Sequence, residues 1–262
     1  LDPQLEMVFA SIIEGNTVGE LWVTGSQTAR CRALLWDQGN NVFYLYGEDL
    51  DDAVLQSMTD LINGEIRDES IRKEQAYFKV HTLSDNVEAY LQKIFTGIQL
   101  THYRKSFYAF KSSRSNQVID PGIKCANIEI IDQDFLQRTA LRGLPSILEE
   151  ILCMWPSPER FFEFGFGTAV VFEGQIIGWC MAEYLSKQMC GIGIMTHKPH
   201  ENKGVASAMA ARFVDHALEL GIKPNWETNR GNKPSIRVAE KVGFEYVQER
   251  TFWWGRFDEV LK

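Results

Sequence analysis

The chain has 262 residues, of which 45% are hydrophobic and 24% are charged. These values are typical of a globular protein with room for two domains. A formal net charge of −8 disfavours a nucleic-acid partner, because phosphate binding needs a concentrated basic surface, and it is compatible with a cationic ligand. No signal-peptide pattern opens the sequence and no stretch approaches the roughly 18 apolar residues of a membrane span, so we expect a cytoplasmic protein without a membrane partner.

The five cysteines are odd in number and show no C-x-x-C spacing. They are Cys31, Cys125, Cys153, Cys180 and Cys190. Since most lie in apolar surroundings, we expect reduced, buried thiols, with a catalytic cysteine as the less favoured alternative. No metal-binding or serine-hydrolase motif occurs, so we expect no metal.

The first part of the chain alternates strand-like and helix-like patterns, which predicts an α/β domain. The expected strands are 19–24, 30–36, 41–46, 76–82 and 99–110, and the expected helices are 50–62 and 85–95. This part carries no chemical motif, so a scaffold or a wall of a substrate pocket is the expected role. The Ser-, Asn-, Pro- and Gly-rich segment Lys111–Lys124 predicts the boundary between domains at 1–115 and 124–262.

The second part predicts the order β-α-β-β-β-α-β-α-β-β. The expected strands are 125–131, 165–172, 175–184, 189–195 and 224–228, followed by a final pair at 244–247 and 251–254. The expected helices are 133–155, with a break at 143–145, then 204–221 and 233–242. No internal repeat is visible in the sequence.

A polar loop becomes an alanine-rich helix abruptly at Lys203–Gly204, directly after an apolar strand. The first turn of a helix leaves four backbone N–H groups without partners and carries the positive end of the helix dipole. Asn202 and Gly204 allow unusual backbone angles, and Ala206 and Ser207 keep the first turn slim. This junction is therefore either an ordinary turn or a phosphate-binding helix start.

The context of this junction resembles the GNAT N-acetyltransferase superfamily. Its members carry a motif of the form [Arg/Gln]-x-x-Gly-x-[Gly/Ala] at this helix start, and a second motif with an Asn before a helix that ends in Gly-Phe. Here Asn232 precedes a helix that ends at Gly243–Phe244. The short stretches T-H, K-G-V-A, P-N-W and A-E-K-V-G-F are similar to the family that includes zwittermicin A resistance proteins. The resemblance implies a GNAT-type fold over the C-terminal half, with a mixed, mostly antiparallel sheet flanked by helices, and a smaller N-terminal α/β domain.

The resemblance also implies acetyl-CoA as cosubstrate, held where two neighbouring strands part. The backbone of Ile194, Met195 and Thr196 would then pair with the pantetheine arm. The pyrophosphate would be bound by the N–H groups of Lys203, Gly204, Val205, Ala206 and Ser207. Asn232 and Ser235 would contact the cofactor from the second motif.

Some positions depart from the superfamily pattern. Glu201 stands where Arg or Gln is usual, and Asn202 where Gly is usual. A carboxylate near a pyrophosphate is repulsive by about 1 kcal/mol at a solvated separation of ~4 Å. Ala239 occupies a position where many members have a Tyr that protonates the leaving thiolate, so water or another group would serve here.

Acetyl transfer to an amine requires a base, and carboxylates near the parting strands are the candidates. They are Glu227, in the strand after the binding helix, and Glu183, at the end of the middle strand of the meander. For His197 and His200, which flank the binding loop, exposed loop residues are the default interpretation.

Two functions of different class remain open. The first is an acetyl-CoA-dependent N-acetyltransferase acting on a small-molecule amine, with a homodimer as one possible assembly. The second is a degenerate acyl-CoA-binding or regulatory module without turnover, which Glu201 and Ala239 would permit. Acylation of a protein amine is a weaker third hypothesis.

Overall fold

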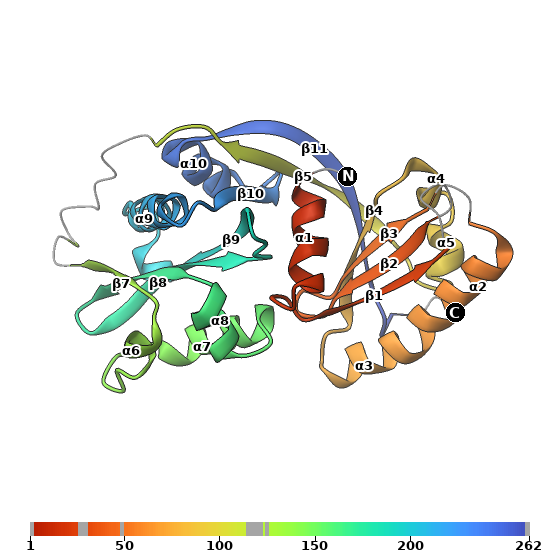
Figure 1. Cartoon of the computed structure of the whole chain (residues 1–262), viewed down its shortest axis with the longest axis horizontal. Helices are drawn as coiled ribbons and strands as arrows, with labels where there is room; N and C mark the ends of the chain where they lie inside the picture. Colours follow the sequence, from red (N-terminus) through yellow and green to blue (C-terminus); the bar gives the residue numbers. More distant parts are fainter. Residues whose placement is uncertain (1–2, 26–30, 48–49, 114–122, 124–125, 260–262) are drawn as a thin grey trace. The chain divides into compact units, whose positions relative to one another are not determined.

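A computed structural model describes residues 3–25, 31–47, 50–113, 123 and 126–259 of the chain (Figure 1). The chain forms two compact units, and each is assembled from two separate stretches of sequence. Unit 1 comprises 1–17 and 105–249, and unit 2 comprises 18–104 and 250–262. These bounds differ from the expected domains 1–115 and 124–262, because the first helix belongs to unit 1 and the last residues belong to unit 2.

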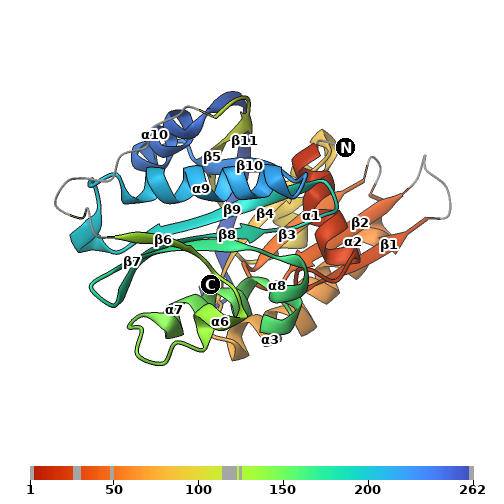
Figure 2. The ribbon, with the colours of Figure 1, turned by 60° about the vertical axis from the view of Figure 1, so that its left-hand side comes forward.

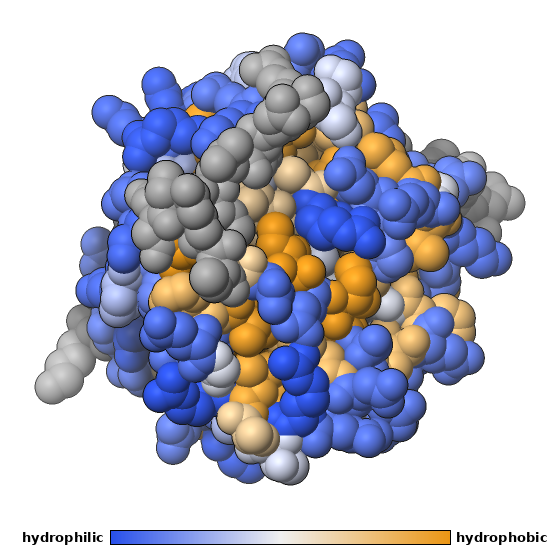
Figure 3. All heavy atoms as spheres, turned by 90° about the vertical axis from the view of Figure 1, so that its left-hand side faces the viewer, coloured by the Kyte–Doolittle hydropathy of each residue, from blue (hydrophilic) through white to orange (hydrophobic). Residues whose placement is uncertain are grey.

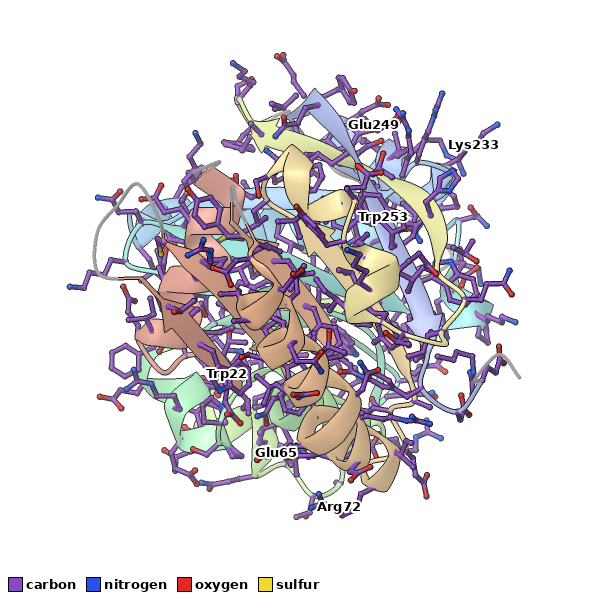
Figure 4. The ribbon with its side chains drawn as sticks, turned by 90° about the vertical axis from the view of Figure 1, so that its right-hand side faces the viewer. Trp22, Glu65, Arg72, Lys233, Glu249 and Trp253 are labelled. Carbon is purple, nitrogen blue, oxygen red and sulfur yellow. The ribbon has the colours of Figure 1, made fainter. Side chains whose placement is uncertain are left out.

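Unit 2 is a sheet covered by helices on one side. Its strands are β1 (Gly19–Thr24), β2 (Arg32–Asp37), β3 (Val42–Tyr46) and β4 (Tyr77–Thr82), followed in the sheet by part of β11 (Phe244–Arg256). Its helices are α2 (Asp52–Leu61), the π-helical turn η2 (Ile62–Ile66), α3 (Arg67–Arg72), α4 (Asp85–Glu88) and α5 (Leu91–Ile94). A core of apolar side chains lies between the two layers, and Trp22 and Trp253, both labelled in Figure 4, pack against it.

Unit 1 contains the strands β6 (Asn127–Ile130), β7 (Gly167–Phe172), β8 (Gln175–Glu183), β9 (Met189–Thr196) and β10 (Lys223–Asn229). The strands from β6 to β9 are antiparallel neighbours, whereas β9 and β10 run parallel. On the other side of β10 lies β5 (Thr101–Phe110), which contributes its C-terminal half to this unit. The sheet is therefore mixed and mostly antiparallel, as expected from the sequence.

Helices cover both faces of this sheet (Figures 1 and 2). One face carries α9 (Val205–Glu219), whose buried residues include Met209 and Phe213, and α10 (Lys233–Val242) follows β10. The other face carries α6 (Gln133–Leu136), α7 (Leu144–Met154) and α8 (Pro158–Phe164). A parallel strand pair requires a crossover connection between its members, and α9 provides it between β9 and β10.

Helix α1 (Pro3–Ile13), at the start of the chain, also belongs to unit 1. The guanidinium of Arg160 on α8 donates to the carbonyl oxygen of Glu14 at 2.8 Å and to Oδ1 of Asn16 at 3.0 Å. The amide of Asn16 in turn donates to the carbonyl oxygen of Leu185 at 3.0 Å. These long-range hydrogen bonds attach the end of α1 to the second part of the chain, a connection that local sequence patterns do not encode.

The same order of elements occurs in both units. In unit 2 the antiparallel strands β1, β2 and β3 are followed by α2–α3 and by β4, which is parallel to β3. In unit 1 the antiparallel strands β7, β8 and β9 are followed by α9 and by β10, which is parallel to β9. The structure thus contains a repeat that the sequence does not reveal.

The two parallel pairs differ in length. Strands β3 and β4 are paired along four residues, from Val42–Lys79 to Leu45–Thr82. The ladder between β9 and β10 comprises two pairs, Met189–Lys223 and Cys190–Pro224. Beyond Cys190 these two strands part, although β9 continues to pair with β8 up to Thr196.

Most of the strands and helices predicted from the sequence are confirmed, including β1 and α10 with their expected bounds. The prediction of a final strand pair was wrong, because β11 is one continuous strand. The segment Gln248–Arg250 contains no turn-forming residue. The helices α1, α3 and α8 were not predicted. Residues 114–122 and 124–125, most of the expected boundary segment, lie outside the described residues.

No helix among the described residues is long and apolar enough to cross a membrane. On the face shown in Figure 3, apolar side chains gather in the middle and hydrophilic side chains surround them. The exposed large apolar residues of unit 1 include Leu148, Leu152 and Phe164.

Candidate functional site

A pocket of about 500 Å³ opens in unit 1 next to the parted strands. It is lined by the end of β9, the loop and first turn of α9, one residue of β10, and one face of α10. The lining residues are Ile194, Met195, Thr196, His200, Glu201, Asn202, Gly204, Val205, Ala206, Ser207, Trp226, Asn232, Pro234, Ser235, Arg237, Val238 and Lys241. Nine of the ten residues expected to contact a cofactor are in this set, and Lys203 is the exception.

The start of α9 has the geometry that the sequence suggested. Asn202 and Gly204 both adopt the left-handed region, with φ of 60° and 78°. Gly204 is the N-cap residue, and no side chain in the described part of the chain caps the helix. The N–H groups of the first turn therefore face the pocket without a side-chain acceptor, which is the arrangement that binds a phosphate group.

The start of α10 forms the opposite wall of the pocket. Oδ1 of Asn232 accepts a hydrogen bond from the backbone N–H of Ser235 at 3.3 Å and so caps the helix. The Ser235 hydroxyl accepts a hydrogen bond from the buried indole of Trp226 at 3.1 Å. Its own proton can therefore be donated to a ligand.

Both signs of charge occur around the pocket. Arg237 and Lys241, spaced i and i+4 on α10, are basic lining residues, and Glu201 is acidic. Neither basic residue was predicted from the sequence. They share one helix face with Pro234 and Val238, and this spacing could have indicated them. The two cations make the pocket suitable for an anionic ligand.

Two polar atoms near the pocket lack a hydrogen-bond partner. They are Oγ1 of Thr196 and Nδ1 of His200, both buried and without a partner in the described part of the chain. The ring of His200 lies edge-on to Phe172, with centroids 6.1 Å apart. A buried polar atom without a partner is costly, so both atoms gain when a ligand supplies one.

The Glu183 side chain lies on the face of the unit 1 sheet that is opposite to the pocket. On β8, Gly178 faces α9, because a Cβ atom there would lie 3.4 Å from Cε of Met209. Side chains alternate along a strand, so Met181 and Glu183 face the other way, where they line a small crevice with Glu150, Met154 and Trp155. Burial raises the pKa of the Glu150 carboxyl above its usual range.

The Glu183 carboxylate lies across β9. A Cβ atom added to Gly193 would fall 2.0 Å from Oε1 of Glu183. Since Gly193 is three residues beyond Cys190, this carboxylate lies beside the part of β9 that has separated from β10.

Glu227 has a different environment. Its carboxylate forms an ion pair with Lys105 on β5, and its side chain is 40% exposed. Its neighbour Trp226 faces the pocket, so the alternation along β10 turns Glu227 away from it. The structure therefore does not bring Glu227 together with the predicted cofactor residues.

Comparison with known proteins gives the family. The family model described as GNAT acetyltransferase matches residues 2–252. The chain belongs to the GNAT acetyltransferase family. The match extends over both compact units, whereas the sequence motifs indicated the C-terminal half.

Similar proteins carry related descriptions. An uncharacterized N-acetyltransferase, YdfB of Bacillus subtilis, is 27% identical over 185 residues, which cover 70% of this chain and 67% of the relative. Among solved structures, a GCN5-related N-acetyltransferase-like protein from Streptococcus suis has a TM-score of 0.63 at 17% identity and covers 96% of this chain and 93% of its own. A tandem GNAT protein from the clavulanic acid biosynthesis pathway has a TM-score of 0.54 at 11% identity. The match covers 92% of this chain and 84% of that protein's chain.

The family makes this GNAT protein an acyltransferase, and family members use acetyl-CoA as cosubstrate. At these identities, the solved structures support the fold alone. The tandem description of one of them agrees with the repeated order of elements in this chain.

The buried thiols of this GNAT protein are unsuited to nucleophilic chemistry. Burial, together with the neighbouring charge of Glu183, raises the pKa of the Cys180 and Cys190 thiols well above the usual value. Since the thiolate is the reactive form, both cysteines stay inert at neutral pH. The expectation of reduced, buried thiols is confirmed for these two residues, while Cys31 and Cys153 are half-buried.

We predict that a thiol reagent at pH 7–8 labels Cys31 and Cys153 of the folded protein much faster than Cys180 and Cys190. The reason is that the two buried thiols are neither ionised nor accessible. Peptide mapping by mass spectrometry after timed labelling measures this, with the denatured protein as the control in which all five cysteines react. Rapid labelling of Cys190 in the folded state would contradict its assigned environment.

Proposed function

We propose that this protein is an acetyl-CoA-dependent N-acetyltransferase whose acceptor is a small cationic amine. The observation that carries the proposal is the pocket beside the parted strands β9 and β10, in which an uncapped helix start faces two cations of α10. Membership of an acetyltransferase family gives the reaction class.

The pocket suits each part of the cosubstrate. The backbone of Ile194–Thr196, unpaired on the β10 side, can form strand-like hydrogen bonds with the amides of the pantetheine arm. The N–H groups of residues 203–207 can bind the pyrophosphate at the start of α9, where the helix dipole favours negative charge. Arg237 and Lys241 compensate further negative charge of the nucleotide.

The reaction proceeds by attack of the neutral amine nitrogen on the thioester carbonyl carbon. The new C–N bond forms, the C–S bond breaks, and the amine gives up a proton to a base while the thiolate of CoA accepts one. Backbone N–H groups of β9 near Met195 can stabilise the oxyanion. Ala239 is fully buried and does not line the pocket, so we assign protonation of the thiolate to water.

We assign the base to Glu183 rather than to Glu227. The Glu183 carboxylate lies over β9 at Gly193, about 7 Å along the strand from Met195, so a direct or water-mediated proton transfer is possible. Glu227 forms an ion pair with Lys105 and its side chain is 40% exposed, so its carboxylate is already engaged by a cation.

Charge and family resemblance favour a small cationic acceptor. Glu150 and Glu183 both line the crevice on the acceptor face, and the chain carries a net charge of −8, so a cation is attracted. The resemblance to the zwittermicin A resistance family, whose substrate is an aminopolyol, agrees with this choice.

The test is a thiol-release assay with acetyl-CoA and a panel of small amines, aminoglycosides and polyamines, with product masses measured. We expect acetylation of at least one small cationic amine. Binding of CoA without acetylation of any amine would favour the regulatory-module alternative, and acetylation of peptide amines alone would favour a protein acceptor.

We predict that Ala206→Glu weakens CoA binding by at least about tenfold, or ~1.4 kcal/mol, because it places a negative charge in the first turn of α9 beside the pyrophosphate. Ala211→Glu is the matched control, since Ala211 is also half-buried on α9 but does not line the pocket. Calorimetry with CoA measures both. Equal affinity of the two variants would exclude the start of α9 as the phosphate site.

We predict that Glu201→Arg tightens CoA binding by up to about tenfold at low ionic strength, because it removes a repulsion and adds an attraction. Glu201→Gln should give an intermediate affinity, and both gains should shrink as salt increases. An unchanged dissociation constant at low salt would show that Glu201 does not act on the cofactor.

We predict that Glu183→Gln lowers kcat by about 10²–10⁴ at neutral pH while the affinity for CoA is retained. Glu227→Gln, which removes an ion pair at the surface, should retain kcat. Steady-state kinetics and calorimetry together measure both variants. The reverse pattern would transfer the role of base to Glu227.

A further inference from the structure

The absence of a side chain at Gly193 determines where the Glu183 carboxylate lies. We infer that Gly193 is a positioning residue for catalysis: it leaves the space over β9 in which this carboxylate reaches the parted strands. The inference rests on the proposed function and deepens it.

The geometry at Gly193 is specific. A Cβ atom added there would lie 2.0 Å from Oε1, 2.8 Å from Cδ and 3.2 Å from Cγ of Glu183. The three nearest atoms thus all belong to one side chain, and the closest is its charged end. Real Cβ atoms do not approach other atoms to 2.0 Å, so any residue except glycine must displace the carboxylate.

The neighbouring strand pairing explains why the displacement matters. Met181 pairs with Gly193 and Glu183 pairs with Gly191, so the Glu183 side chain extends along β9 from Gly191 to Gly193. This direction leads away from the last pair of β9 with β10 and into the separated segment. A displaced carboxylate would turn back toward β8 or out to solvent, away from the reacting atoms.

The backbone itself does not require glycine at this position. Gly193 is not among the residues with a positive φ, so alanine fits its backbone conformation. Replacing glycine by alanine at such a position also lowers the entropy of the unfolded chain, which favours folding. The carboxylate end of the flexible Glu183 side chain can move away from a new Cβ atom at little cost. Stability therefore does not account for a glycine here.

The test is Gly193→Ala, measured for kcat, for the dissociation constant of CoA and for thermal stability. We expect kcat to fall by at least about tenfold, since geometry at the reacting atoms controls the rate. CoA affinity and the melting temperature should stay close to wild type. Gly191→Ala is the matched control on the same strand face, because its Cβ would meet Glu183 O at 3.2 Å and Tyr184 Cδ2 at 3.4 Å but not the carboxylate.

A double-mutant cycle separates positioning from simple obstruction. In a Glu183→Ala background there is no carboxylate to displace, so Gly193→Ala should cause no further loss of kcat. An equal loss in both backgrounds would mean that the new methyl group blocks substrate, and it would overturn the inference. Wild-type rates in Gly193→Ala would also overturn it, while the loss in Glu183→Gln would still support the proposed function. Absence of turnover in the wild-type protein would be the separate failure of that function.

Discussion

The separation of two parallel strands is the constraint on which the site depends. Strands β9 and β10 form two backbone pairs and then part, which leaves the polar groups on one edge of β9 without a strand partner. Unpaired backbone groups are costly in a protein interior, so they need a ligand or water. The pocket, the uncapped start of α9 and the cations of α10 all adjoin this edge. The fold thus brings unpaired backbone N–H and C=O groups together at one edge, and an extended, polar cosubstrate can form hydrogen bonds with them.

The repeated half of the chain shows what happens when the strands do not part. In unit 2, β3 and β4 stay paired along four residues, and the N–H of Leu83 continues the pattern to the carbonyl of Leu45 at 2.8 Å. The helix that follows β3 begins with Asp51, whose side chain accepts from the N–H of Val54, and continues with Asp52. Acidic residues satisfy and neutralise that helix start, so it repels phosphate. The same order of elements therefore has parted strands and an uncapped helix start in unit 1, and paired strands and a capped, acidic helix start in unit 2.

Local features of the site were predictable from the sequence, while features that join distant segments were not. Asn202 and Gly204 indicated a helix start with left-handed residues before it, because permissive residues at a loop-to-helix junction have few other uses. The sequence placed Glu227 ahead of Glu183 as the base, and our proposal reverses this order. The reversal depends on Lys105, more than a hundred residues away, and on the position of the Glu183 carboxylate in the assembled sheet. For the same reason the helix at the start of the chain was missed as part of unit 1: hydrogen bonds from Arg160 attach it.

The two faces of the sheet divide the chemistry between them. The pocket that suits the cosubstrate is lined by α9 and α10, whereas Glu183 lies on the face covered by α7 and α8. The backbone pairing of β9 with β10 ends after Cys190, and in our proposal the groups bound on opposite faces meet beside this unpaired segment. Under the proposed function, the anionic cosubstrate would be bound beside Arg237 and Lys241, and the cationic acceptor would be bound on the other face beside Glu150 and Glu183. In our proposal, Glu183 connects the two faces, because its carboxylate lies over β9 at Gly193.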